Sequence, residues 1–155
     1  MTVTAHDDNI VAWYMALLAT ITQASGYNTD AGLNVYLDLD YDTEPEKIPC
    51  SILYPGEVTD SLEGNTPPGA GEENHYLPLK FEGHIKEDDE NTLGKALRND
   101  LLRAIKADRF AGGLTEGFEG NITSNVITEE SANRGYVSFV QIELTVFYVT
   151  AWGEI

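Results

Sequence analysis

The sequence has little cysteine, histidine and positive charge, and each scarcity disfavours a class of protein. One cysteine, Cys50, cannot form an internal disulfide, and three histidines leave little for a zinc or other metal centre. Only 9 bases stand against 26 acids, and the net charge of −17 repels the phosphate backbone of nucleic acids. The longest apolar run, residues 10–21, is shorter than the roughly 20 residues that span a membrane, and no basic signal-peptide start precedes it. We expect an intracellular soluble protein without cofactor, metal, membrane or specific nucleic-acid binding.

What is present is typical of one folded domain. Hydrophobic residues make up 42% and charged residues 23% of 155 residues, which is ordinary globular usage and predicts a single domain over residues 1–155. Residues 56–74 are rich in Gly, Pro, Glu, Asp and Ser and have few apolar side chains. Because such a stretch buries too little surface to order itself, we predict a long flexible loop there.

The first predicted helix follows the helix-start residues 7–9 and carries an apolar stripe at helical spacing up to Gly26, which should end it. No charged residue occurs between Asn9 and Thr29, and the face opposite the stripe is formed by Ala16, Ala19 and Thr20. A helix face in water normally carries charge. Two interpretations stay open: the helix is buried deep in the domain, or this second face contacts another subunit.

Three strands are predicted next. Residues 33–42 alternate strictly between an apolar set, which we expect in the core, and a polar set that includes Asp38, Asp40 and Asp42. Residues 50–54 form a short strand bracketed by prolines, which predicts an exposed edge. The third strand, residues 77–85, points Leu77, Leu79 and Phe81 inward, and we expect it to pair with the second across the loop.

The second predicted helix begins after an acidic stretch, residues 87–91, which suits a helix N-terminus, and it carries an apolar stripe over residues 93–105. At about 100° per residue, five of the nine bases fall on the arc opposite that stripe. These bases are Lys95, Arg98, Arg103, Lys106 and Arg109. We predict that they line one exposed face.

Two strands close the chain, at residues 122–127 and 135–148, and the last has apolar residues on both faces, so we expect it inside the sheet. The order is α-β-β-β-α-β-β. It predicts an α+β fold in which two helices pack on a mixed, mainly antiparallel sheet of about five strands.

Candidate catalytic and metal-binding residues do not form a recognisable pattern. Asp38, Asp40 and Asp42 resemble the start of a calcium loop, but Thr43 and Pro49 occupy positions that need glycine and glutamate. The histidines have no nucleophile motif nearby and are expected on the surface, and Cys50 is expected to be a small buried hydrophobe. We therefore predict no catalytic or metal site and no enzyme.

The feature that remains is a pair of opposite charges, the acids of residues 38–42 and the basic helix face. Opposite patches on different sides of one subunit favour head-to-tail contact between copies, and such contacts close into rings. The eight residues named above are therefore the candidate subunit or partner contacts. The alternative is that the bases neutralise acids within their own subunit.

The whole pattern resembles the tail terminator proteins of long-tailed bacteriophages, of the minor tail protein U type. The features that carry the resemblance are the uncharged first helix, the alternating strand 33–42, the proline-bounded strand before a polar loop, the stretch 75–85, the helix segment 96–101 and the closing strand 135–148.

The resemblance implies a structural virion protein at the head-proximal end of the tail, made in the host cytoplasm. Six copies would form a ring that caps the tail tube, stops its polymerisation and offers a joining surface to the head connector or head-completion protein, while DNA passes through. Another neck, connector or tail-completion protein would meet the same demands. From other classes, an acidic DNA-mimic inhibitor and a small-molecule enzyme are the alternatives.

Overall fold

The fold is α+β, seen here in a computed structural model that describes residues 5–40, 45–61, 72–87, 91–131 and 135–151. In chain order its helices and strands are α1 (His6–Leu18), β1 (Val35–Leu37), β2 (Cys50–Pro55), β3 (Thr59–Ser61), β4 (Glu72–Lys86), α2 (Thr92–Ala107), β5 (Gly117–Ser131) and β6 (Gly135–Ala151). Three short 3-10 turns, η1 (Gln23–Ser25), η2 (Ala31–Leu33) and η3 (Ala111–Gly113), connect them.

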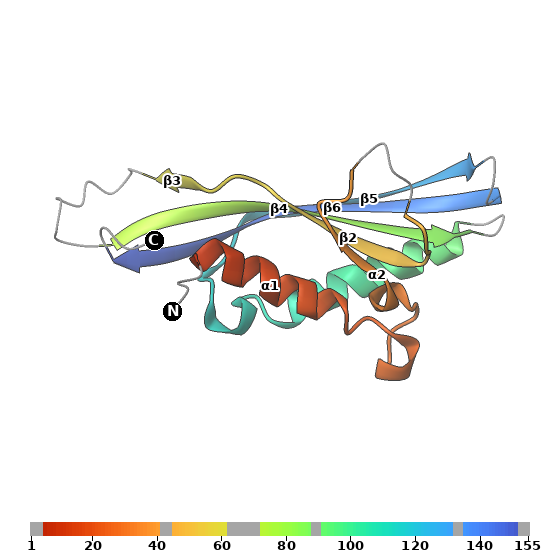
Figure 1. Cartoon of the computed structure of the whole chain (residues 1–155), viewed down its shortest axis with the longest axis horizontal. Helices are drawn as coiled ribbons and strands as arrows, with labels where there is room; N and C mark the ends of the chain where they lie inside the picture. Colours follow the sequence, from red (N-terminus) through yellow and green to blue (C-terminus); the bar gives the residue numbers. More distant parts are fainter. Residues whose placement is uncertain (1–4, 41–44, 62–71, 88–90, 132–134, 152–155) are drawn as a thin grey trace.

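One sheet runs in the order β1-β2-β4-β6-β5, and β3 pairs with the part of β4 that lies beyond β2. Among the strand pairs of the described residues, only β1–β2 is parallel. Both helices cover the same side of the sheet, which we call the helix side, and β4 and β6 run past them (Figure 1). The opposite side of the sheet is called the outer face below.

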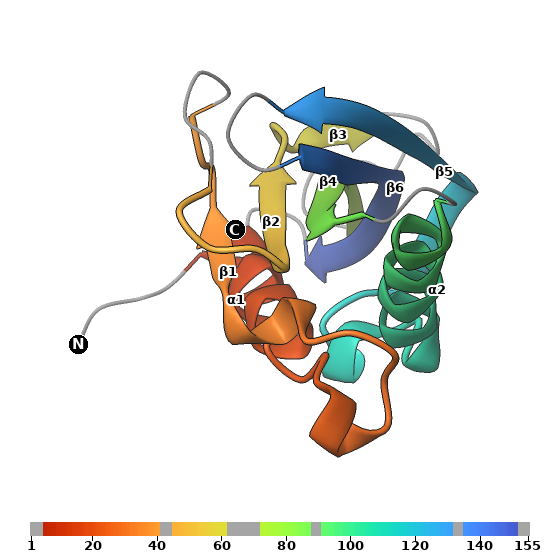
Figure 2. The ribbon, with the colours of Figure 1, turned by 90° about the vertical axis from the view of Figure 1, so that its right-hand side faces the viewer.

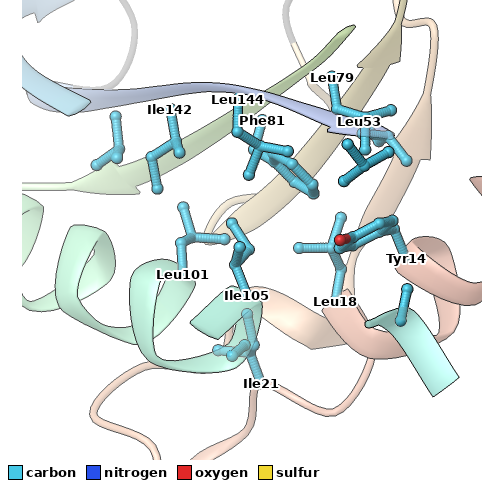
Figure 3. Close-up of a cluster of buried hydrophobic side chains, with 14 of the residues drawn as sticks. Tyr14, Leu18, Ile21, Leu53, Leu79, Phe81, Leu101, Ile105, Ile142 and Leu144 are labelled. Carbon is cyan, nitrogen blue, oxygen red and sulfur yellow. The ribbon is translucent and has the colours of Figure 1, made fainter. Parts of the chain in front are cut away.

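The core fills the space between the helices and the sheet (Figure 3). Alternate residues of β4 point into it, among them Leu79 and Phe81, and they meet Tyr14 of α1 and Leu101 of α2. Each such side chain, fully buried, contributes about 1.5–3 kcal/mol to stability. Close packing of α2 depends on Gly94, where an added Cβ would lie 2.7 Å from the Ser138 side chain.

Most predicted elements are confirmed. The second helix, the inward faces of the third strand, and its antiparallel pairing with the proline-bounded strand are all present as α2, β4 and the β2–β4 pair. The last strand lies inside the sheet between β4 and β5, and Cys50 is buried. The predicted turn at residues 131–135 falls mostly outside the described residues.

The predicted strand over residues 33–42 is too long, because among its described residues, 33–40, only Val35–Leu37 is a strand. Leu33 and Leu37, expected in the core, are 67% and 48% exposed. The cause lies just before them: Gly32 packs so closely on α1's end that an added Cβ would meet the Leu18 carbonyl at 2.5 Å. Ala31 is therefore the residue that enters the core fully, and in the alternating set that follows Leu33 and Leu37 are exposed while Val35 is half-buried against the core.

Three boundary predictions also need correction. The first helix ends at Leu18, and Gly26, with φ of 92°, closes the 3-10 turn η1 instead. β2 is not an edge strand, because β1 pairs with its other side. The predicted loop 56–74 contains β3 and the start of β4, while residues 62–71 lie outside the described residues.

The uncharged face of α1 is exposed. Ala16, Ala19 and Thr20 all face solvent, so the interpretation that this helix is buried on all sides is wrong. The other interpretation, contact of this face with another subunit, stays a prediction.

Candidate functional site

The basic face of α2 consists of Lys95, Arg98, Arg103 and Lys106. Lys95, Arg103 and Lys106 are exposed on the side of α2 away from its buried stripe, which contains Leu97, Leu101 and Ile105, and Arg98 is half-buried beside that stripe. Arg109, the fifth predicted base, lies beyond Asp108, the C-cap of α2, and so is not on the helix. The structure thus places three of the five bases on the predicted exposed face, with Arg98 half-buried at its border.

The five bases differ in what they contact. Arg103 donates from Nη1 to the Gly26 carbonyl at 2.9 Å, and its guanidinium lies 4.5 Å from the centre of the Tyr27 ring. Arg109 lies over the Phe110 ring at 5.1 Å. Within the described part of the chain, no acidic side chain forms an ion pair with any of the five. The alternative, that these bases neutralise acids of their own subunit, is therefore not supported by the described residues.

The predicted acidic contacts lie on the other side of the molecule. Asp38 and Asp40 are exposed and follow β1, the edge strand opposite in the sheet order to β5. Asp38 has a left-handed φ of 51°, and its N–H donates to the Leu53 carbonyl at 2.9 Å, so the chain turns here and the acids share no strand face. Asp42 lies outside the described residues. β1 and α2 stand on opposite sides of the subunit (Figure 2).

The outer face of the sheet contains an open hollow of about 460 Å³. It crosses the ends of β2 and β5 and the middle of β4 and β6, and is lined by Tyr54, Gly56, Pro78, Leu79, Lys80, Asn121, Thr123, Glu143, Leu144 and Thr145. The register between β5 and β6 shifts between Glu119 and Thr123, which leaves Asn121 in an irregular segment at the hollow's border. Sequence patterns did not indicate this hollow.

A buried polar cluster on the helix side was also missed. His75 was expected on the surface, but it is 7% exposed, which makes that expectation wrong. Its Nδ1 is hydrogen-bonded to the Asp60 carboxylate of β3, and its Nε2 lies 2.7 Å from Thr150 Oγ1 and 3.7 Å from Glu73 Oε2. The sequence does contain one signal for this burial: His75 lies two residues before Leu77, so both side chains point to the same face of the strand.

The order of groups in this cluster, a carboxylate, a histidine and a hydroxyl, is the order that activates a nucleophile in some hydrolases. Thr150 is only 9% exposed, however, and the contacts join β3, β4 and β6. Tyr148 stacks between His75 and His6, at 4.8 and 4.5 Å between ring centres. Burial of its hydroxyl group and, to a smaller extent, the negative charges of Asp7 and Asp60 raise the pKa of Tyr148 to about 12. The arrangement is consistent with a structural role, because its contacts connect β3, β4, β6 and α1.

Two further buried carboxylates contact α2 or belong to it: Glu87 lies at its N-terminus, and Asp100 lies in its middle. Glu87 accepts from the N–H groups of Leu93 and Gly94 at 3.0 and 2.7 Å, which confirms the predicted acidic helix start for that residue. Asp100 accepts from the backbone and side chains of Asn28 and Thr29. The chain before β1 is thereby fixed against α2, next to the basic face.

A comparison of the sequence with models of known protein families gave no match, and a comparison with curated proteins gave none either. Neither helix in the described residues has the length and apolar character that a membrane span requires. The same residues contain no group of His, Cys, Asp and Glu side chains arranged to hold a metal ion.

Proposed function

We propose that this chain is a structural subunit that associates head to tail with copies of itself into a closed ring. One observation carries the proposal: α2, whose basic face is unpaired with acids in the described residues, lies across the subunit from β1 (Figure 2). The exposed Asp38 and Asp40 follow β1 in the chain. A contact between two different surfaces can repeat around a ring, and opposite charges steer the copies into register.

The net charge of the chain explains why contact between a basic and an acidic surface matters. Copies that carry −17 each repel one another at long range, so association needs a local surface of opposite sign. The basic face is such a surface. Because exposed charges are screened over about 8–10 Å in 0.1–0.15 M salt, the association should weaken as salt concentration rises.

We further propose that the ring is the tail terminator of a long-tailed bacteriophage. The resemblance of the sequence pattern to that family supports this role, which includes a six-membered ring, contacts with the tail tube and the head connector, and a place at the head-proximal end of the tail. A strongly acidic ring suits this position, since its wall would let DNA pass without binding it. No catalytic step belongs to the proposal.

Self-association is tested by light scattering and sedimentation over a range of protein and salt concentrations. Arg98→Glu combined with Lys106→Glu should keep the fold, seen by circular dichroism, and weaken association. Lys47→Glu combined with Lys86→Glu changes net charge equally, uses two exposed bases outside α2, and is the matched control. A wild-type protein that stays monomeric at every concentration and salt would contradict the proposal.

The role in the virion is tested by electron microscopy of particles assembled without this protein. Overlong tails or tails without heads are expected. Normal tails joined to heads would refute the tail terminator role while leaving ring formation to the solution experiment.

A further inference from the structure

The sheet has two edge strands, β1 and β5, which lie at opposite ends of the strand order. Among the described residues, each of them has a paired neighbour on one side only. From Thr123, where the register shift of β5 ends, to Thr128, the sequence of β5 contains no charged residue and no proline. Charged side chains and prolines are common means by which an edge strand is kept from pairing with another chain. This stretch of β5 is therefore an unprotected edge.

The hydrogen bonds of β6 show which backbone groups of β5 point to this edge. The Phe147 carbonyl accepts from the N–H of Glu116, just before β5, and β6 keeps one register along β4. Because successive residues of a strand direct their backbone groups to opposite sides, the odd-numbered residues of β6 bond to β5. Their partners in β5 are also odd-numbered, as in the pair of Asn125 and Gln141. The even-numbered residues from Ser124 onward thus direct their N–H and carbonyl groups to the open edge.

The free backbone groups of β1 can be assigned in the same way. The Asn34 carbonyl and the Asp38 N–H are both hydrogen-bonded to β2, each at 2.9 Å. The backbone groups of Val35 and Leu37 therefore point away from β2, to the outside of the sheet.

The free groups of the two edges lie at the same level and match in direction. Followed from pair to pair across the sheet, Val35 is in the same row as Val126, and Leu37 is in the same row as Ser124. β1 runs parallel to β2 and the remaining neighbours are antiparallel, so β1 and β5 run in opposite directions. Two copies placed side by side in one sheet would therefore form an antiparallel pair whose free groups face each other.

The side chains of the two edges match as well. Val35 and Val126 both pack against the core on the helix side. Leu37 lies two residues after Val35 and so shares its side of the strand, yet it is 48% exposed. Opposite Ser124 of a neighbouring copy, Leu37 would lie diagonal to Val126, within reach of it. The apolar residues of β1 that the single subunit leaves exposed would then extend the apolar layer of the neighbour.

Charge selects β1 of another copy as the partner of β5. α2 packs beneath β5, because an added Cβ on Gly94 would lie 2.8 Å from the Val126 side chain, whereas Asp38 and Asp40 follow β1. Pairing of β5 with β1 brings the basic side of one copy to the acidic side of the next. Pairing of β5 with a second β5 would bring two basic faces to one boundary, where they repel.

We propose that β5 of one copy pairs antiparallel with β1 of the next copy, with Val126 opposite Val35 and Ser124 opposite Leu37. The sheet would then continue from subunit to subunit through backbone hydrogen bonds. Because the contact joins two different edges, it is head to tail, and it names the interface of the proposed ring on which it rests.

The backbone contact is tested by proline substitution, with association followed by sedimentation. Ser124→Pro removes an N–H that is free in the single subunit, so the fold should remain and association should fall at least about tenfold. Ser124→Ala keeps the N–H and should associate like the wild type. Asn125→Pro removes an N–H that bonds to β6 and should lower the urea midpoint. Equal midpoints for the two proline variants would contradict the assignment of the free groups.

The side-chain contact is tested at Leu37. Leu37→Ser should weaken association several-fold, because the leucine is buried only when the neighbouring copy binds. Phe110→Ser is the control, since Phe110 is 47% exposed and lies in neither edge strand, and it should leave association unchanged. An equal effect of the two substitutions would count against the edge contact.

A covalent test fixes both the partner and the register. Tyr36 and Asn125 share one row, and between copies they would form the close, non-hydrogen-bonded kind of pair, with Cα atoms about 4.5 Å apart. A chain with Tyr36→Cys and Asn125→Cys should form a ladder of disulfide-linked oligomers on oxidation. Within one chain the two positions are four strand spacings apart, roughly 19 Å along the sheet, and cannot join.

Two controls accompany the ladder. Tyr36→Cys with Ser124→Cys places the thiols on opposite faces of the sheet and should form no ladder. Asn125→Cys alone should stay unlinked, whereas a disulfide dimer of this variant would mean that β5 pairs with a second β5, which refutes the proposal. Cys50 is buried and can remain in all variants.

The outcomes separate the edge contact from the ring itself. If the wild type associates and the α2 charge reversals weaken it, yet Ser124→Pro and Leu37→Ser have no effect and no ladder forms, the ring stands and the edge contact is refuted. If Ser124→Pro fails to fold, Leu37→Ser and the ladder decide. If the wild type is monomeric at every concentration, the ring and the edge contact both fail.

Discussion

Replacement of Asp100 by asparagine should destabilise the fold strongly, although it only exchanges one carboxylate oxygen for an NH₂ group. Asp100 is buried, with Oδ1 accepting from Asn28 N and Nδ2 at 3.0 and 3.1 Å and Oδ2 accepting from Thr29 N and Oγ1, both at 2.7 Å. An amide keeps only one acceptor oxygen. Whichever way it turns, the backbone N–H of Asn28 or of Thr29 faces an NH₂ group.

The magnitude follows from these contacts. A hydrogen bond to a charged group contributes about 1.5–3 kcal/mol, and a buried donor left unsatisfied costs about 1–3 kcal/mol. Since the two terms overlap, we expect a loss of about 3 kcal/mol from Asp100→Asn. Asp and Asn have similar helix propensities, so the change isolates the hydrogen bonds.

The assay is equilibrium unfolding in urea. With a slope of about 1–3 kcal/mol per molar, a loss of this size lowers the midpoint by about 1 M or more. Asn99→Ala, at the exposed neighbouring position, should stay within about 0.5 kcal/mol of wild type. A loss below about 1 kcal/mol for Asp100→Asn would refute the assignment of these four contacts as a principal tie between α2 and the chain before β1.

Two other predictions concern packing and pH. Gly94→Ala should cost about 1–3 kcal/mol, measured as a lowered melting temperature, because the new methyl would lie 2.7 Å from Ser138 and 2.8 Å from Val126; an unchanged melting temperature would contradict this packing. Tyr148 should ionise near pH 12 in an ultraviolet titration, with Tyr148→Phe identifying its signal. Because its pKa is raised in the folded state, Tyr148 contributes stability that is complete below pH 10 and is lost as pH rises toward 12. A folded protein whose Tyr148 ionises at pH 10 would contradict this.

The helices and long strands were predictable because their signals are local. The apolar stripe of α2 and the alternation of β4 are each repeated several times along one segment, so their faces can be assigned without knowledge of the neighbours. Residues 33–42 alternate just as regularly, but Gly32 packs against the end of α1, and this contact between distant parts of the chain decides which side chains enter the core. The sequence of residues 33–42 contains no pattern that would predict this contact.

The candidate site divides in the same way. The bases of α2 could be placed because they lie opposite a clear apolar stripe, whereas the turn at Asp38 depends on a hydrogen bond to β2. The His75 cluster needs Asp60, which lies in a strand formed by residues predicted as loop. The hollow depends on a register shift between two strands, and the register of a pair is not contained in either sequence segment alone.

These contacts allow folding and assembly to be separated by experiment. Arg103 binds the Gly26 carbonyl and the Tyr27 ring, in the same stretch that Asp100 holds, so its reversal changes stability as well as surface charge. Arg98, which is half-buried, and Lys106, which is exposed, form no ion pair with the described residues, and we expect their reversal to change mainly the surface charge. If association is electrostatic, Arg98→Glu with Lys106→Glu lowers it without a change in the urea midpoint, whereas Arg103→Glu alone lowers both. If the wild type and both variants associate equally, the basic face of α2 contacts no other copy.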